Sequence, residues 1–198
     1  MNMERENRRK LSIGATNKGK SSTDFSKIGK RNRTKGADTE RYYADLFREL
    51  GFAYCITARL GSRIHDNAGI DLINIPFNIQ IKGGNHKNLS PGKVLLNMYS
   101  QVNSLFPEDS EIRNYPILLF HRPFIYKKDN NADYVYYTLE QHKKFQMENP
   151  DFEYESIKIR DIMVNNEFGS IVKVPFESFK ENVLLNTLKK NDLQNKQE

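Results

Sequence analysis

Cysteine and long apolar runs are scarce in this sequence, and each shortage excludes a class of protein. Cys55 is the only cysteine among 198 residues, so the chain can form no internal disulfide, and an intracellular location is the simplest interpretation. No segment approaches the roughly eighteen consecutive apolar residues of a transmembrane helix. The charged N-terminus has no apolar segment behind it, which argues against a secretory signal. The four histidines are far apart and lack the spacing of zinc ligands: His65, His86, His121 and His142.

Positive charge is distributed unevenly along the chain. Residues 1–36 contain eleven Lys/Arg and three acidic residues, a balance of +8, so the rest of this +6 chain carries −2. Because Gly, Ser, Asn and Thr separate the charges, we expect residues 1–36 to form a disordered basic arm that attracts phosphates. A solubilising tail is an equally good interpretation. Residues 37–188 suffice for one domain, and 189–198 form a polar tail.

The first regular element that the pattern predicts is a helix over residues 38–50. Asp38 or Thr39 can cap its N-terminus, and Gly51 stands just beyond its end. Its apolar residues follow the spacing of one buried helix face: Tyr43, Ala44, Phe47 and Leu50.

Short strands and helices alternate after this first helix, which indicates an α/β domain with a central mixed sheet flanked by helices. The continuous apolar run at 115–120 is typical of a buried strand. Residues 151–168 give no clear pattern. We predict strands at 52–58, 70–75, 77–82, 134–138 and 171–174, helices at 93–106, 139–148 and 176–188, and polar loops at 59–67 and 83–93.

Glu40 is the first residue whose position suggests chemistry. It precedes Tyr43 and Ala44 by three and four residues, so it shares the buried face of the helix. A carboxylate on that face loses solvation unless a metal ion or a positive partner compensates for it. The alternative is that Glu40 only favours the positive end of the helix.

Two neighbouring strands carry further polar residues. Asp71 interrupts an otherwise apolar strand, and strict alternation in the next strand places Gln80 and Lys82 on one face. We expect the other face, formed by Ile79 and Ile81, to point to the core. An exposed ion pair between the two strands is the competing explanation for Asp71 and Lys82.

Taken in order, these residues resemble the core of the PD-(D/E)XK nucleases. In that superfamily a helical Glu precedes a strand Asp and then a strand with an acid-x-Lys motif, as Glu40, Gly69-Ile70-Asp71-Leu72 and Ile79-Gln80-Ile81-Lys82 do here. Lys35-Gly36 before the helix and Arg59-Leu60-Gly61-Ser62 after it resemble archaeal and phage Holliday-junction resolvases. Ile-Gln-x-Lys is similar to Mrr-type restriction enzymes. The resemblance covers roughly residues 35–84.

The resemblance implies a restriction-endonuclease-like fold and a metal-dependent DNA endonuclease. The expected catalytic residues are Glu40, Asp71, Gln80 and Lys82. The expected metal ligands are Asp71, Glu40 either directly or through a water, the Gln80 amide oxygen and the Ile81 backbone carbonyl. This all-oxygen set suits Mg²⁺, with Mn²⁺ as a substitute. Lys82 is expected to orient the attacking water and stabilise the phosphate. Gln80 departs from the usual Asp or Glu, which puts metal affinity and the number of metals in doubt.

Loop and arm residues are the expected contacts to DNA. They are Lys35, Arg59, Ser62, Arg63 and Lys87, with Asn85 and His86 beside them. For each loop residue a solvated role is the alternative. For Asp66 we favour a role in the turn over metal binding. We expect Tyr134, Tyr136 and Tyr137 to pack within the sheet, with base stacking as the alternative. We expect His121 to mark the end of its strand, with a role as general base as the alternative.

The resemblance also implies a partner and a location. A junction resolvase cuts two strands symmetrically, so we expect a homodimer that binds four-way DNA junctions and no membrane. A phage-type protein of this kind works in the cytoplasm of the host, with the virion as the alternative. Two other functions stay open, namely a restriction or repair nuclease on duplex DNA and a non-catalytic DNA-binding or structural protein with the same fold.

Overall fold

The protein is described by a computed structural model that covers residues 22–83, 90–110, 116–121, 133–157 and 170–194. The chain divides into two compact units, Met1–Arg33 and Thr34–Glu198. The boundary falls within helix α1 (Ser22–Glu49). The sheet and the site described below belong to the second unit.

Helix α1 begins much earlier than the sequence pattern predicts. We expected residues up to 36 to be disordered, and this is wrong for residues 22–36, which are helical. Extending an existing helix adds one hydrogen bond for each residue fixed, and Lys and Arg are good helix formers. Thr39 therefore lies inside the helix, where its hydroxyl donates to the Lys35 carbonyl at 2.9 Å. Residues 1–21 lie outside the described part of the chain.

The C-terminal end of α1 is the one that the sequence predicts. Gly51 has φ +118°, a conformation that favours glycine. Its N–H donates to the Arg48 carbonyl, and the N–H of Phe52 donates to the Phe47 carbonyl, both at 3.0 Å. This pair of bonds satisfies carbonyls that the last turn would otherwise leave open. It directs the chain from the helix toward the sheet.

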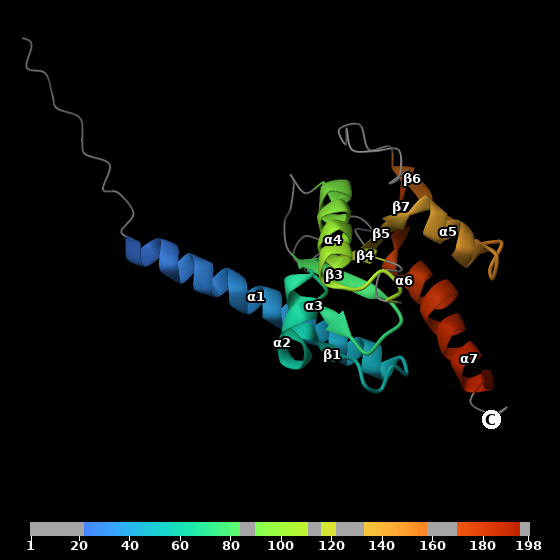
Figure 1. Ribbon diagram of the computed structural model, residues 1–198, viewed down its shortest axis with the longest axis horizontal. Coiled ribbons are helices and arrows are strands. Elements are labelled where there is room, and N and C mark those ends of the chain that lie inside the picture. Colours follow the sequence, from blue (N-terminus) through green and yellow to red (C-terminus); the bar gives the residue numbers. More distant parts are fainter. Residues whose placement is uncertain (1–21, 84–89, 111–115, 122–132, 158–169, 195–198) are drawn as a thin grey trace, which may run out of the picture. The chain divides into compact units, whose positions relative to one another are not determined.

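Seven strands of the described residues form one mixed sheet in the order β1-β2-β3-β4-β5-β7-β6 (Figure 1). Only the β3–β4 pair is parallel, and all other neighbours are antiparallel. Helix α4 (Pro91–Leu105) connects the parallel pair, as a parallel connection requires. The strands are β1 (Ile56–Thr57), β2 (Leu72–Ile73), β3 (Asn78–Gly83), β4 (Pro116–His121), β5 (Tyr134–Thr138), β6 (Glu155–Ile157) and β7 (Ile171–Pro175).

Helices cover both faces of this sheet. On one face α1 packs against Ile117 and Leu119 of β4, together with α6. On the other face α4 packs against Leu118 and Phe120 through Leu95. β4 is therefore buried on both faces, which confirms the prediction from its apolar run. The remaining helical elements are α2 (Ala58–Gly61), α3 (Arg63–Asn67), α5 (Leu139–Gln146), α6 (Phe176–Phe179), the π-helical turn η3 (Lys180–Leu184) and α7 (Leu185–Gln194).

The segment between β1 and β2 differs from its predicted form. A polar loop was expected at 59–67, but the chain forms the two short helices α2 and α3, which meet at Ser62. The N–H of Ser62 donates to the Ala58 carbonyl at 2.7 Å, and the N–H of Asp66 donates to the Ser62 carbonyl at 3.1 Å. Polar side chains are compatible with such single turns because one side faces solvent. The strand predicted at 52–58 is reduced to β1.

None of the helices in the described residues has both the length and the apolar character of a membrane span.

Candidate active site around Glu40 and Asp71

Asp71 lies immediately before β2, and the sheet holds its backbone on both sides. Its N–H donates to the Ile79 carbonyl at 2.8 Å, and its own carbonyl accepts from the Ala58 N–H at 2.9 Å. The carboxylate reaches across to β3, where Oδ2 accepts the Ile81 N–H at 2.6 Å. Asp71 is 9% exposed. Its carboxylate is thus fixed at the start of a short hairpin.

Burial makes the ionised form of Asp71 unfavourable. It raises the pKa of this carboxyl to about 7, and the nearby Glu40 carboxylate adds to the increase. The Ile81 N–H, Lys82 and Arg59 oppose the shift because they stabilise the charged form. A carboxyl with its pKa near neutrality and several charged neighbours is typical of a functional site.

Glu40 faces the same cluster from α1. It is 4% exposed, as the helical pattern predicts, and shares its face with the buried Tyr43 and Ala44. Burial raises the pKa of the Glu40 carboxyl, whereas Arg59 lowers it through its charge and a hydrogen bond; Asp66 raises it and Lys82 lowers it to a smaller extent. Glu40 therefore depends on neighbouring cations to stay ionised.

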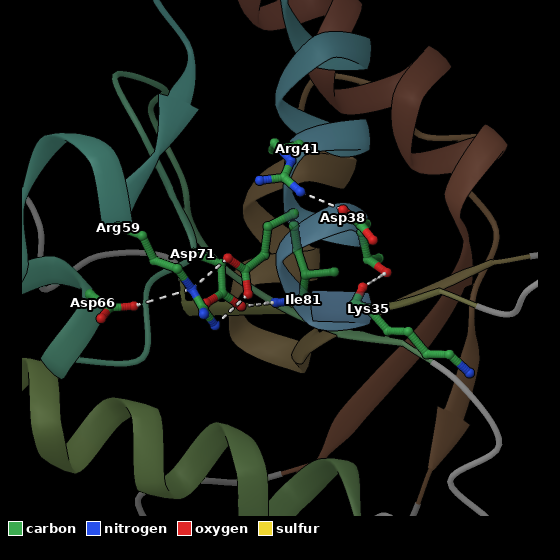
Figure 2. A network of polar contacts seen from close by, with 9 residues as sticks. Lys35, Asp38, Arg41, Arg59, Asp66, Asp71 and Ile81 are labelled. Atoms are coloured by element: carbon green, nitrogen blue, oxygen red, sulfur yellow. Dashed lines mark hydrogen bonds and ion pairs between the residues drawn. The ribbon is translucent and has the colours of Figure 1, made fainter. Parts of the chain in front are cut away.

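Arg59 of α2 is the main partner of Glu40. Its Nη2 donates to Oε1 at 2.8 Å, and its Nε lies 2.8 Å from Oε2. The second contact lacks the angle of a hydrogen bond, so Oε2 has no hydrogen-bond donor among the described residues. Figure 2 shows Arg59 between Asp66 and Asp71, and Asp66 Oδ1 lies 3.9 Å from Nε.

Lys82 and Gln80 extend from β3 on the face opposite Ile79 and Ile81. Both isoleucines are buried in the core that contains α1, which confirms the predicted alternation. Lys82 follows Ile81, whose N–H binds the Asp71 carboxylate, and its charge lowers the pKa of both the Glu40 and the Asp71 carboxyl. The charges of Glu40, Asp71 and Lys82 therefore influence one another although these residues are far apart in the sequence.

Gln80 is positioned by a glycine. Gly69 has φ +75°, and a Cβ atom built on it would lie 2.7 Å from Gln80 Nε2. The Gln80 amide therefore packs directly over the Gly69 backbone. Gly69, two residues before Asp71, thus leaves the space that the Gln80 side chain of the adjacent strand β3 occupies.

The Ile81 backbone faces the same side as Asp71. Its N–H donates to Asp71, and the N–H and C=O of one strand residue point to the same side. The Ile81 carbonyl is therefore directed to the β2 side of β3. Figure 2 shows the contact between Asp71 and Ile81.

The oxygen donors at this site suit a hard cation better than a transition metal. They comprise the carboxylates of Glu40 and Asp71, the Gln80 amide and the Ile81 carbonyl, with no sulfur or imidazole. The described residues contain no cluster of three or more His, Cys, Asp or Glu side chains that could hold a metal. The buried Glu40 Oε2, which lacks a hydrogen-bond donor, is the atom that a cation would satisfy. A Mg²⁺ ion held by these residues would have two charged ligands, Glu40 and Asp71.

The predicted DNA contacts have diverse surroundings. Lys35 and Arg63 are exposed, and Arg59 belongs to the carboxylate cluster. The Ser62 hydroxyl lies 2.6 Å from His65 Nδ1, so it already has a partner. Lys87 lies outside the described residues, together with Asn85 and His86.

A second polar cluster surrounds His121 at the end of β4. Asp133 Oδ2 accepts the Tyr43 hydroxyl at 2.8 Å and lies 3.2 Å from His121 Nδ1. The end of the strand at His121 was predicted, whereas this cluster was not. No spacing in the sequence relates Asp133 to a tyrosine 90 residues earlier.

The tyrosines of β5 behave mainly as packing residues. Tyr137 is fully buried, Tyr136 is 9% exposed, and Tyr134 lies under the Lys173 ammonium, which is 4.3 Å from the ring centroid. Burial of Tyr136 and Tyr137 supports the packing interpretation over base stacking.

Comparison with protein-family models, with curated proteins and with solved structures finds no match to this chain.

Proposed function

We propose that this chain is a Mg²⁺-dependent DNA endonuclease of the PD-(D/E)XK type. The proposal is supported by the buried Glu40 of α1 beside Arg59 and by the buried Asp71, which binds the β3 backbone next to Lys82. The effects of these charges on the pKa of Glu40 and of Asp71 add to this support. The helix, the hairpin β2–β3 and the parallel strand β4 are also the elements that a restriction-endonuclease-like core needs. Mn²⁺ is expected to replace Mg²⁺.

The residues of the site have separate roles in this proposal. Asp71 and Glu40 supply the two negative charges that a divalent cation requires, and Gln80 and Ile81 supply neutral oxygens. Bound there, the ion would provide Lewis-acid stabilisation and a more acidic water. Lys82 orients that water and stabilises the charge that grows on the phosphate oxygens. Asp71 is held in place for this role by the Ile81 N–H.

The substrate we favour is a four-way DNA junction, cut by a homodimer of the Holliday-junction resolvase kind. The support is the resemblance of Lys35-Gly36 and Arg59-Leu60-Gly61-Ser62 to such resolvases. Duplex DNA is the substrate of the related alternative, a restriction or repair nuclease. The same catalytic residues serve both reactions, so the DNA structure alone distinguishes them.

A non-catalytic role is the second candidate, and two observations favour it. Gln80 replaces a charged ligand, and Arg59 already compensates Glu40. A protein that had lost catalysis while keeping the fold could bind DNA or act as a structural component, for example in a phage particle.

Cleavage assays on four DNA structures test these proposals. Four-way, nicked, flapped and linear DNA are incubated with wild type, Asp71→Ala and Lys82→Ala in Mg²⁺ and in EDTA. We expect Mg²⁺-dependent cleavage by wild type, strongest on the junction. Loss of one electrostatic contact typically lowers the rate about 10²–10³-fold, so both variants should be nearly inactive while their DNA binding is retained.

Equal cleavage by wild type and both variants would refute the assigned roles. Binding without cleavage by wild type, in Mg²⁺ and in Mn²⁺, would favour the non-catalytic candidate. Arg41→Ala serves as the control because it removes an exposed charge that pairs with Asp38 and leaves Glu40, Asp71 and Lys82 in place.

A further inference from the structure

Arg59 supplies Glu40 with a cation from within the protein. Two nitrogens of its guanidinium lie 2.8 Å from the two carboxylate oxygens. The Glu40 side chain is 6% exposed and that of Arg59 is 46% exposed, so the cation reaches the buried acid from the solvent side. Nη2 forms a charge-assisted hydrogen bond with Oε1, whereas Nε pairs with Oε2 by charge alone. A divalent cation bound to Glu40 would have to use the same oxygens.

A second carboxylate lies within reach of Arg59. Asp66 Oδ1 is 3.9 Å from Arg59 Nε, and the Asp66 side chain is 41% exposed. Both residues belong to the short helices α2 and α3, so a change of side-chain conformation moves Arg59 from one acid toward the other. Figure 2 shows Arg59 with its contact to Asp66. Arg59 therefore has an alternative partner when it leaves Glu40.

The charges of the cluster favour this exchange when a divalent ion is present. With both acids ionised, Glu40 and Asp71 carry two negative charges, which the two positive charges of Arg59 and Lys82 balance. A divalent ion added while Arg59 stays on Glu40 would therefore leave an excess of positive charge, and movement of Arg59 to Asp66 would reduce it. Like charges at short range in a poorly solvated site repel strongly.

We propose that Arg59 is the resident counter-ion of Glu40 in the metal-free protein and has to leave this carboxylate before Glu40 can ligate a divalent ion. The inference rests on the proposed nuclease function and deepens it. The released guanidinium has five donors that suit a phosphate group. Arg59 thereby couples metal binding to binding of the DNA backbone, and each ligand strengthens the other by the same factor.

Calorimetric titration with Mn²⁺ alone tests this competition. Arg59→Met keeps an unbranched apolar stem and removes the guanidinium with its charge, and Arg63→Met removes an exposed charge four residues away as a matched control. Breaking a charge-assisted pair releases Glu40, so we expect Arg59→Met to bind Mn²⁺ roughly ten-fold more tightly than wild type or better. We expect Arg63→Met to remain within about two-fold of wild type. Unchanged or weaker binding by a folded Arg59→Met would overturn the inference.

Arg59→Lys provides a second test if the methionine variant does not fold. It keeps a positive charge near Glu40 but cannot place two nitrogens beside the two carboxylate oxygens, so its Mn²⁺ affinity should lie above that of wild type. An affinity equal to or below that of wild type would count against the inference.

The Nε–H resonance of Arg59 in the wild type gives a readout that does not depend on a variant. Saturating Mg²⁺ should shift this signal and accelerate its exchange with water. A signal that does not change, in a protein that binds the ion, would mean that Arg59 stays on Glu40.

Failure of the proposed function has a different signature. In that case Mn²⁺ binds to none of the three proteins, wild type, Arg59→Met and Arg59→Lys. Alternatively, Mn²⁺ binds to each of them as tightly as to the same protein that also carries Asp71→Asn. Binding that requires Asp71 but is indifferent to Arg59 would overturn only the present inference.

Discussion

Asp71 gives the most quantitative prediction because its ionised form is unfavourable in the folded protein. Its ordinary pKa is 3.8, and burial raises it to about 7. Between these pH values the folded chain holds a proton that the unfolded chain releases. The contribution of protonated Asp71 to the free energy of unfolding is therefore fully present below pH 3.8 and is lost as the pH rises through about 7.

The size of this effect follows from the shift. Three pKa units at about 1.4 kcal/mol each correspond to roughly 4 kcal/mol of stability that the ionised carboxylate removes at pH 8. Asp71→Asn abolishes the charge and keeps an oxygen that can accept the Ile81 N–H. We expect it to stabilise the metal-free protein at pH 8 by about 1–4 kcal/mol, since the new amide nitrogen needs an acceptor that it only partly finds.

Urea unfolding in EDTA at pH 5, 6.5 and 8 measures this prediction. Wild type should lose stability as the pH rises, and Asp71→Asn should show a smaller slope. Part of the slope persists because burial also raises the pKa of Glu40. Asp151→Asn, which changes an exposed carboxylate between α5 and β6, should follow wild type. An Asp71→Asn protein that is less stable than wild type at pH 8, or equally dependent on pH, would refute the reasoning.

Three further predictions concern the surroundings of the site. Gly69→Ala should lower stability by about 1–2 kcal/mol and should also lower Mn²⁺ affinity, because Gly69 has a positive φ and the new Cβ would meet Gln80. Gly51→Ala, which is also at a positive φ but lies beside Leu188, should lower stability and leave the Mn²⁺ affinity unchanged. Equal Mn²⁺ affinities of Gly69→Ala and wild type in calorimetry would show that Gly69 does not position Gln80. Tyr43→Phe should destabilise the fold by about 1–3 kcal/mol in urea unfolding because the Tyr43 hydroxyl donates to Asp133. Tyr42→Phe, at the exposed neighbouring residue, is the control, and equal urea midpoints of wild type and Tyr43→Phe would argue against that bond. Sedimentation equilibrium should give twice the monomer mass, whereas a monomer at all concentrations would contradict the resolvase form of the proposal.

Local patterns predicted the parts of the fold that depend on burial. The apolar run of β4, the inner face of α1 and the alternation in β3 all follow from which side chains must leave water. The glycine after α1 was predictable because a left-handed residue is required there. Placing Glu40 on the buried face used the same argument.

Other features depend on partners distant in the sequence or on weak preferences. The helix at 22–36 has no apolar stripe, so periodicity could not reveal it. The short helices α2 and α3 contain few turns, and their sequence also suits a loop. The pairing of Arg59 with Glu40 joins residues 19 positions apart in different elements, and the contact of Asp133 with Tyr43 joins residues still farther apart. Such pairs become visible only when the sheet has brought their elements together.

Calorimetric titration of wild type and Asp71→Asn with Mg²⁺ and Mn²⁺ tests most directly whether Glu40, Asp71 and Lys82 form one metal-dependent site. The account predicts measurable binding by wild type, tightened by Lys82→Met, which removes a competing positive charge, and lost in Asp71→Asn. No binding by wild type, or binding that Asp71→Asn leaves unaltered, would contradict it.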